Sequence, residues 1–281
     1  MKIKIFLLFI VLSFFNIAFA SDSEICEREF KDKNYTRALQ YCEKACSKDD
    51  GGGCAGLGSL YGGGLGVKQD YKQAKTYLEK ACSQNDGLDC TSLGVLYAKG
   101  LGVKQDYKQA KTYFEKACSL NDGEGCIRLG WLYHDGRGVK RDYQQEITYY
   151  EKACSLNDGK GCNLLGVLYV DGRSVKQDYK QAKTYFEKAC SLNDGWGCSK
   201  LGAFYYLGRG VKQDYKQAKN YFEKGCGQNN GEGCIMLGGL YDFGLGVKQN
   251  KKVSKEYYGK ACDLGLQKGC EEYRKLNEQG Y

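Results

Sequence analysis

Cysteines recur every 36 residues along this chain of 281 residues, in two parallel series. The first series is Cys46, Cys82, Cys118, Cys154, Cys190, Cys226 and Cys262, and the second is Cys54, Cys90, Cys126, Cys162, Cys198, Cys234 and Cys270. The residues between them also repeat, in units at 52–87, 88–123, 124–159, 160–195, 196–231 and, more loosely, 232–267. A fixed period of this length predicts a stacked array of small units.

Each unit is expected to form two helices joined by a glycine-rich turn. In 88–123, the first helix is predicted from Asp89 to about Ala98, and Asp106 is the expected N-cap of the second. The segment Asn121-Asp122-Gly123 is expected to end that second helix as a C-cap and turn. One such hairpin cannot bury its own apolar stripe, whereas stacked hairpins can.

A glycine recurs inside every first helix, although glycine costs a helix interior about 1 kcal/mol. These glycines are Gly58, Gly94, Gly130, Gly166, Gly202 and Gly238. Their repetition predicts a close approach between helices, at a point where no side chain fits.

The repeated motif LGxLYxxGxGVxxDYxxAxxYxEKA resembles the Sel1-like repeat, a relative of the tetratricopeptide repeat. With a cysteine pair in each unit and an N-terminal export signal, the chain also resembles the Helicobacter cysteine-rich protein family, or Hcp β-lactamase family. The expected fold is an all-α, right-handed α/α superhelical solenoid of Sel1-like repeats stapled by disulfides. We expect one domain over 21–281, with a short N-terminal repeat at 22–51, the six longer units, and a closing helix at 268–279.

The sixteen cysteines all lie outside the first 20 residues, which predicts disulfides in an oxidising compartment. Within each Cys-x7-Cys pair, one cysteine ends a helix and the other begins the next, so the two side chains can meet. The seven predicted pairs are 46–54, 82–90, 118–126, 154–162, 190–198, 226–234 and 262–270. Cys26 and Cys42 are left over and are expected to bridge the first hairpin. No metal site and no cofactor are predicted, because there is no Cys-x2-Cys motif and His134 is the only histidine.

Residues 1–20 are typical of a signal peptide. Lys2 and Lys4 precede an apolar stretch at 5–15, and Ala18-Phe19-Ala20 fits a cleavage site. The predicted location is therefore secreted or periplasmic after cleavage near Ala20, with an uncleaved anchor as the alternative. No stable membrane anchor is expected, because the apolar stretch is short for a membrane span.

The formal net charge is +8, but the basic residues alternate with acidic residues and glutamines. This alternation predicts a solvated surface, so no nucleic-acid partner is expected. The predicted state is a monomer.

A catalytic constellation is not evident in the sequence, and the catalytic residues are unknown. Neither S-x-x-K nor K-T-G occurs, and a Ser-His-Asp triad would depend on His134. Penicillin binding and slow β-lactam hydrolysis are implied by the family resemblance alone.

Positions on the outer face of the first helices vary between units, while the Leu-Gly and Leu-Tyr packing positions barely change. Ile127, Trp131 and His134 are expected to share this face. The predicted ligand-binding residues are Arg128, Trp131, His134, Asn163 and Lys200.

The predicted function is a binding scaffold for a peptide, a peptidoglycan fragment or a protein partner. The alternative is a penicillin-binding protein with weak β-lactamase activity, which would bind β-lactams. A structural repeat protein without a specific ligand is a third possibility.

Overall fold

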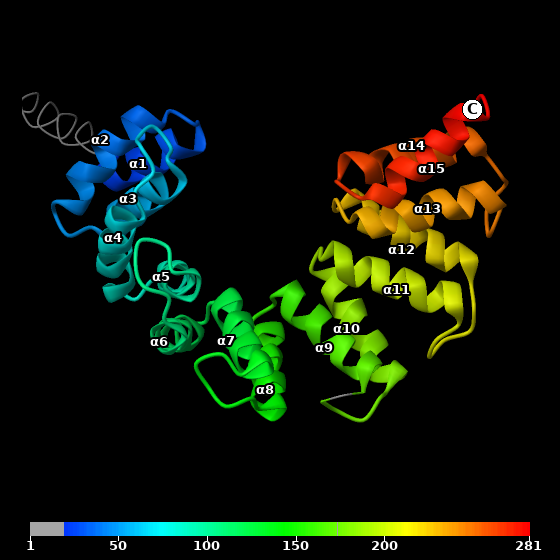
Figure 1. Ribbon diagram of the computed structural model, residues 1–281, viewed down its shortest axis with the longest axis horizontal. Helices are drawn as coiled ribbons and strands as arrows, with labels where there is room; N and C mark the ends of the chain where they lie inside the picture. Colours follow the sequence, from blue (N-terminus) through cyan, green and yellow to red (C-terminus); the bar gives the residue numbers. More distant parts are fainter. Residues whose placement is uncertain (1–19, 173) are drawn as a thin grey trace, which may run out of the picture. The chain divides into compact units, whose positions relative to one another are not determined.

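The structure is a computed structural model that describes residues 20–172 and 174–281. The predicted signal peptide lies outside the described residues, apart from Ala20. The described chain is all-helical (Figure 1). Its helices are α1 (Asp22–Lys31), α2 (Tyr35–Cys46), α3 (Gly51–Gly63), α4 (Tyr71–Ser83), α5 (Gly87–Lys99), α6 (Tyr107–Ser119), α7 (Gly123–Asp135), α8 (Tyr143–Ser155), α9 (Gly159–Asp171), α10 (Tyr179–Ser191), α11 (Gly195–Leu207), α12 (Tyr215–Gly227), α13 (Gly231–Phe243), α14 (Lys251–Asp263) and α15 (Gln267–Glu278).

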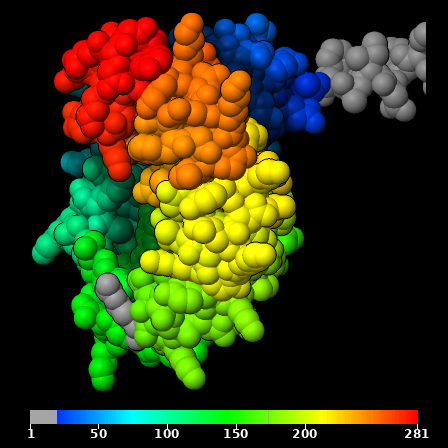
Figure 2. All heavy atoms as spheres, turned by 90° about the vertical axis from the view of Figure 1, so that its right-hand side faces the viewer, coloured from blue at the N-terminus to red at the C-terminus, as the bar shows by residue number. Residues whose placement is uncertain are grey.

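Contacts divide the chain into two compact units, Met1–Gln105 and Asp106–Tyr281, which are described separately. The prediction of one domain over 21–281 remains a prediction. Within each unit the helices follow one another as packed hairpins, as the fold prediction requires. In the space-filling view, the repeats that end the second unit, coloured yellow to red, pack directly against one another (Figure 2).

Aspartates set the start of both helices in a repeat. Asp122 caps α7 by accepting a hydrogen bond from the backbone N–H of Gly125, and Asp142 caps α8 by accepting from Gln144 and Gln145. The prediction that Asp122 belongs to the turn that ends the preceding helix is therefore wrong. Asn121 alone makes that turn in a left-handed conformation (φ 66°), so its neighbour is left to begin the next helix.

In five of the repeats, the glycine inside the first helix allows the second helix of the same repeat to approach closely. A Cβ atom placed on Gly130 would lie 2.5 Å from Cε1 of Tyr150, which is too short for any real contact. Gly166 and Gly202 meet the rings of Phe186 and Phe222 in the same way. The predicted close approach is therefore confirmed in these repeats, where an aromatic side chain occupies the space; at Gly58 the occupying side chain is Leu78.

In five repeats the two helices are also joined by a pair of stacked tyrosines. Tyr133 and Tyr149 stack with ring centroids 5.6 Å apart. The same pair recurs as Tyr61–Tyr77, Tyr169–Tyr185, Tyr205–Tyr221 and Tyr241–Tyr257. These pairs and the buried leucines, such as Leu129 and Leu165, give these five repeats similar cores.

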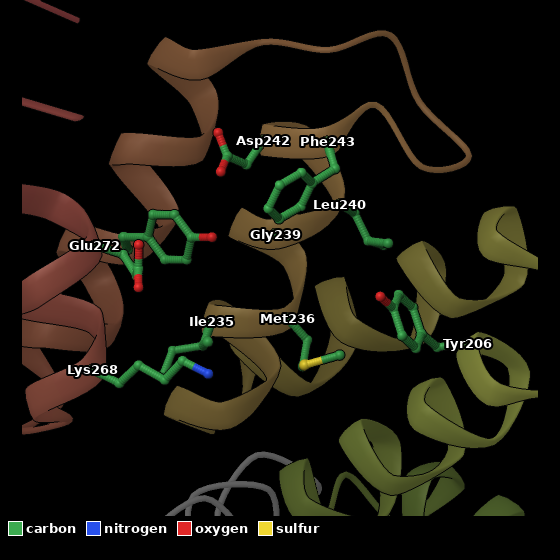
Figure 3. Close-up of a pocket in the computed structure, with 10 residues that line it drawn as sticks. Tyr206, Ile235, Met236, Gly239, Leu240, Asp242, Phe243, Lys268 and Glu272 are labelled. Carbon is green, nitrogen blue, oxygen red and sulfur yellow. The ribbon is translucent and has the colours of Figure 1, made fainter. Parts of the chain in front are cut away.

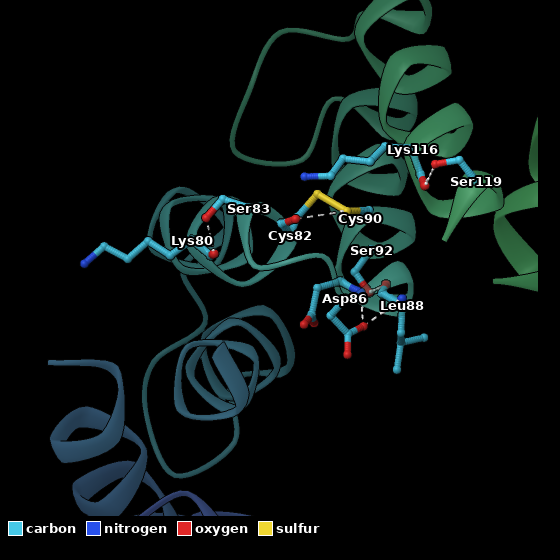
Figure 4. Close-up of a disulfide and its surroundings, with 10 residues drawn as sticks. Lys80, Cys82, Ser83, Asp86, Leu88, Cys90, Ser92, Lys116 and Ser119 are labelled. Atoms are coloured by element: carbon cyan, nitrogen blue, oxygen red, sulfur yellow. Dashed lines mark hydrogen bonds between the residues drawn. A yellow bond between two sulfur atoms is a disulfide. The ribbon is translucent and has the colours of Figure 1, made fainter. Parts of the chain in front are cut away.

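Eight disulfides link the described cysteines, and none of these cysteines is free. Seven join the Cys-x7-Cys partners, so that each ties the end of one repeat to the start of the next. Figure 4 shows the Cys82–Cys90 bond between α4 and α5. The eighth joins Cys26 of α1 to Cys42 of α2, as predicted for the first hairpin.

Candidate binding surface on the first helices

Trp131 lies on the outer face of α7 and is 43 % exposed, which is unusual for so large an apolar side chain. The guanidinium of Arg128, one turn earlier, lies 5.6 Å from the centre of its ring. The same guanidinium pairs with Glu124, with 2.7 Å between Nη2 and Oε1. The guanidinium of this predicted ligand-binding residue is therefore already paired with a carboxylate of the protein.

Ile127 does not share this face, contrary to the sequence analysis. Its side chain is 1 % exposed and packs in the core with Cys118, Cys126 and Ile147. The corresponding residues Thr91 and Ser199 are buried too. In these three helices the preceding second helix covers the first turn, whereas the equivalent residues Ala55, Asn163 and Ile235 are only partly buried.

His134 is held by a buried carboxylate that the sequence analysis did not identify. Its Nδ1 lies 2.9 Å from Oε1 of Glu146, which projects from α8 and is 2 % exposed. The hydroxyl of Tyr150 also donates to Glu146, and the pKa of Tyr150 is raised by burial and by this carboxylate. The other oxygen of Glu146, Oε2, has no partner among the described residues. This arrangement orients the imidazole, and in its neutral form it leaves Nε2 as an acceptor.

A signal for this carboxylate does exist in the sequence. The position of Glu146 is alanine in most other repeats, namely at Ala74, Ala110, Ala182 and Ala218. A charged residue in a column of buried alanines indicates either a defect or a specific partner, and here the partner is His134.

Lys200 borders an apolar hollow between α9 and α11, which we call the Lys200 hollow. It has a volume of about 290 Å³, and its lining includes Val167, Val170, Ala203 and Leu207. The ammonium of Lys200 lies 3.3 Å from Glu232 and 5.7 Å from the centre of the Trp196 ring. Like Arg128, this predicted residue is therefore already paired within the protein.

A second hollow lies beside α13 and is called the Phe243 hollow (Figure 3). Its volume is about 340 Å³, and Tyr206, Met236, Gly239 and Phe243 form its apolar lining. Phe243 is 70 % exposed. Lys268 and Glu272 of α15 give the hollow a charged border, as Figure 3 shows.

The two hollows are built from equivalent positions, 36 residues apart. Ala203 and Gly239 correspond to Trp131, Met236 corresponds to Lys200, and Phe243 corresponds to Leu207. The first helices of the second unit therefore carry variable side chains around a recurring hollow.

The five predicted binding residues do not meet in one pocket. Arg128, Trp131 and His134 lie together on α7, and Lys200 borders its own hollow. Asn163, on α9, lines neither hollow, and its Oδ1 is buried without a partner among the described residues. Whether these residues bind a ligand remains a prediction.

The Sel1 repeat model matches the chain seven times, at residues 28–50, 52–86, 90–122, 123–158, 159–194, 197–230 and 231–266. The chain belongs to the Sel1 repeat family. The predicted boundaries of the Sel1 repeats differ from these matches by only a few residues, except in the shortened first repeat.

Solved structures agree with this assignment. A Sel1 repeat protein from Oxalobacter formigenes is 24 % identical, with a TM-score of 0.73 over 86 % of this chain and 97 % of that one. A protective antigen of uropathogenic Escherichia coli with the same type of fold is 29 % identical, with a TM-score of 0.73 over 92 % of this chain and 56 % of that one. Comparison with curated proteins gave no match.

The cysteine-rich character of this Sel1 protein also has a relative. Helicobacter pylori cysteine-rich protein B is 41 % identical over 47 % of this chain and 96 % of that one, with a TM-score of 0.40. This chain and that protein are thus similar in sequence over one half of this chain.

Sel1 repeats form scaffolds that mediate protein interactions, and the eight disulfides of this one indicate an oxidising, extracytoplasmic location. Among the described helices, none is both long enough and apolar enough to span a membrane.

Proposed function

We propose that this Sel1 protein is an exported scaffold that binds an extended polypeptide along the first helices of its second unit. The observation that supports this most strongly is the recurrence of the hollow at equivalent positions of α11 and α13. Each hollow is large enough for one apolar side chain. A polypeptide can present such side chains at intervals, which suits a surface built from repeats.

The chemistry of the hollows favours a polypeptide over a peptidoglycan fragment. Their linings are mostly aliphatic and aromatic, and two of the charged groups at their edges are paired within the protein, Lys200 with Glu232 and Asp242 with Lys251. A saccharide would need several converging hydrogen-bond donors and acceptors. Trp131, with Arg128 beside it, would serve as a further anchor on α7, because both residue types are frequent at interface hot spots.

Export is part of the proposal. A chain cleaved near Ala20 would begin just before α1, whose N-cap is Ser21. The disulfides support the same conclusion, since they form and persist in oxidising compartments.

The proposal can be tested by selecting peptides from a random phage-displayed library on the oxidised mature protein. We expect sequences with apolar side chains at regular spacing. Their binding should be weakened by Ala203→Trp, because the new tryptophan, the residue found at the equivalent position 131, would fill the Lys200 hollow. Lys216→Gln, on the exposed face of α12, is the matched control. Failure to select any peptide, or equal loss of binding in both variants, would contradict the proposal.

β-Lactam hydrolysis, the alternative from the sequence, is not favoured by any observation in the described residues. The same preparation can be tested for nitrocefin turnover and for covalent labelling by a fluorescent penicillin. Turnover that follows the monodisperse protein through purification would favour a β-lactamase over a binding scaffold.

A further inference from the structure

A separate cavity lies in the first unit, between α1, α3 and the start of α5. It has a volume of about 340 Å³, and its lining includes Glu27 and Phe30 of α1, Gly56 of α3, and Asp86, Leu88 and Asp89. This cavity shares no residue with the hollows of the second unit. It lies at the lower end of the size range of ligand sites, about 300–1,000 Å³.

Asp89 is the unusual residue of this cavity. It is 7 % exposed, and no hydrogen bond or ion pair to its carboxylate exists among the described residues. A mostly buried carboxylate without a protein partner is costly when it is ionised, so the group either takes up a proton or needs a cation beside it.

Packing also disfavours an aspartate at this position. The corresponding residues of the other repeats are glycines, at Gly53, Gly125, Gly161, Gly197 and Gly233. At Gly161, an added Cβ would lie 2.6 Å from Cβ of Ala153, because the start of the helix presses on the end of the preceding one. Asp89 therefore places a side chain where packing favours glycine, and it places a carboxylate where burial disfavours a charge. Such a combination indicates a functional residue.

The charges around Asp89 are mostly negative, although the chain as a whole carries a formal net charge of +8. Asp86 uses Oδ1 to cap α5, accepting from the N–H groups of Leu88 and Asp89 (Figure 4). Glu27 pairs with Lys31 on the surface, 2.6 Å apart. The cavity thus contains more carboxylates than the protein itself neutralises.

A metal ion does not account for these carboxylates. Within the described residues, no three or more histidine, cysteine, aspartate or glutamate side chains are grouped so that they could hold one. The walls are also apolar, through Phe30, Ala55 and the Cys26 side of the first disulfide. Apolar walls with acidic groups suit an organic cation on a hydrocarbon chain.

We propose that this cavity binds a lysine or arginine side chain of a partner polypeptide, with Asp89 and Asp86 receiving the charged group. The methylene groups would pack against Phe30 and Leu88, and the ammonium or guanidinium would compensate the buried carboxylate. Leu88 is 65 % exposed at the edge of the cavity, which favours a polypeptide that covers it over a free amine. The proposal does not depend on the hollows of the second unit.

The test is an NMR titration of the oxidised, ¹⁵N-labelled mature protein with the tripeptide acetyl-Leu-Arg-Leu-amide. The control ligand carries citrulline, which has nearly the shape of arginine but no charge. We expect the arginine peptide to shift the amide signals of Gly56, Leu88 and Asp89, and to bind at least tenfold more tightly than the citrulline peptide. Equal binding of the two peptides, or no binding of the arginine peptide and its lysine counterpart, overturns the proposal.

Asp89→Gly is the decisive variant, because glycine is the residue that the other repeats carry and folding should be retained. Asp89→Gly should lower the affinity for the arginine peptide at least tenfold. Glu79→Gln on α4, outside the cavity, should leave the affinity for this peptide unchanged. Unchanged affinity in folded Asp89→Gly would show that the carboxylate is not the receptor.

Proton release gives a second readout. Burial and the neighbouring Asp86 raise the pKa of Asp89 to about 7, and Glu27, Lys31 and Asp86 are the other charged groups that line the cavity. A bound cation favours the ionised form, so binding near pH 6 should release protons, measurable by calorimetry in two buffers. Asp89→Gly should abolish this release. Spermidine that binds as tightly as the peptide would overturn the assignment to a polypeptide.

Discussion

At the scale of single residues, the repeat supplies its own reference. Five or six copies of each position show what the packing alone prefers, and a residue that departs from its column needs a separate explanation. Glu146 in a column of alanines and Asp89 in a column of glycines are the clearest departures, and both are buried carboxylates. Glu146 has His134 and Tyr150 as partners, whereas Asp89 has none among the described residues.

The first prediction concerns the buried network of α8. Replacing Glu146→Ala together with Tyr150→Phe copies Ala110 and Phe114 of the preceding repeat. We expect the free energy of unfolding to stay equal or to rise by up to about 2 kcal/mol, because an incompletely satisfied buried carboxylate is exchanged for apolar packing. Denaturation in guanidinium chloride measures it.

Glu146→Ala alone serves as the comparison for this double variant. It leaves the hydroxyl of Tyr150 without its acceptor, so it should be less stable than the double variant by about 1–2 kcal/mol. A double variant that is less stable than the wild type by more than about 1 kcal/mol would show that the network stabilises the fold.

The second prediction concerns the pH dependence of stability. Burial and Asp86 raise the pKa of Asp89 to about 7 in the folded protein, while an unfolded aspartate titrates near 3.9, as a rough reference value. Between these values the folded state binds more protons than the unfolded state. Its free energy of unfolding therefore falls as the pH rises from about 4 to about 7, and the loss is complete above the folded pKa.

Asp89→Gly removes this dependence, so the two proteins should be compared across that pH range. We expect the stability of the wild type relative to Asp89→Gly to fall by on the order of 2 kcal/mol between pH 4 and pH 7. Parallel stability curves for the two proteins would mean that Asp89 titrates normally.

At the scale of helices, most of the structure could be predicted from the sequence, because helix signals are local and were repeated six times. The predicted helix from Asp89 to about Ala98 corresponds to α5, Gly87–Lys99, and the closing helix predicted at 268–279 corresponds to α15, Gln267–Glu278. The cap at Asp122 was missed because an aspartate after an asparagine suits a turn as well as a helix start.

The candidate site was less predictable, because its contacts join different helices. The spacing of residues on α7 placed Trp131 on the surface, but it could not show that Arg128 pairs with Glu124 or that His134 reaches Glu146 on α8. The error at Ile127 has the same origin, since helical spacing does not reveal how far a neighbouring helix covers the first turn.

The third prediction is the double swap Arg128→Ser with Trp131→Val, which copies Ser92 and Val95. Stability should change little, since the packing positions are untouched and Glu124 keeps a second partner, Lys160, at 3.3 Å. Affinity for a peptide selected on the wild type should fall at least tenfold, equivalent to about 1.4 kcal/mol. Fluorescence anisotropy measures it, and unchanged affinity in the folded variant would remove α7 from the binding surface.

At the scale of the whole molecule, the disulfides tie each repeat to the next. Contacts between neighbouring repeats carry the stability of a repeat array, so the loss of one disulfide should loosen part of the array without unfolding the rest. Each Cys-x7-Cys bond closes a short loop and contributes roughly 2.5 kcal/mol to the free energy of unfolding in the chain-entropy model.

The fourth prediction follows from this arrangement. Cys118→Ser with Cys126→Ser should lower the melting temperature, while the far-ultraviolet circular dichroism at 20 °C still shows a helical protein. Peptide mapping of the unreduced wild type should recover the eight bonds of the structure as its control. A link between cysteines 36 residues apart, such as Cys82–Cys118, would contradict the pairing, and an unchanged melting curve after full reduction would contradict the role of the bonds.

Photo-crosslinking can show whether the first helices of the second unit form the polypeptide-binding surface. Benzoylphenylalanine is introduced at Trp131, at Phe243, or at Thr184 on the exposed face of the second helix α10, and each variant is irradiated with a labelled peptide selected on the wild type. We expect crosslinks from positions 131 and 243 that excess unlabelled peptide suppresses, and none from position 184. Crosslinking from position 184 alone, or equally from all three positions, would contradict it.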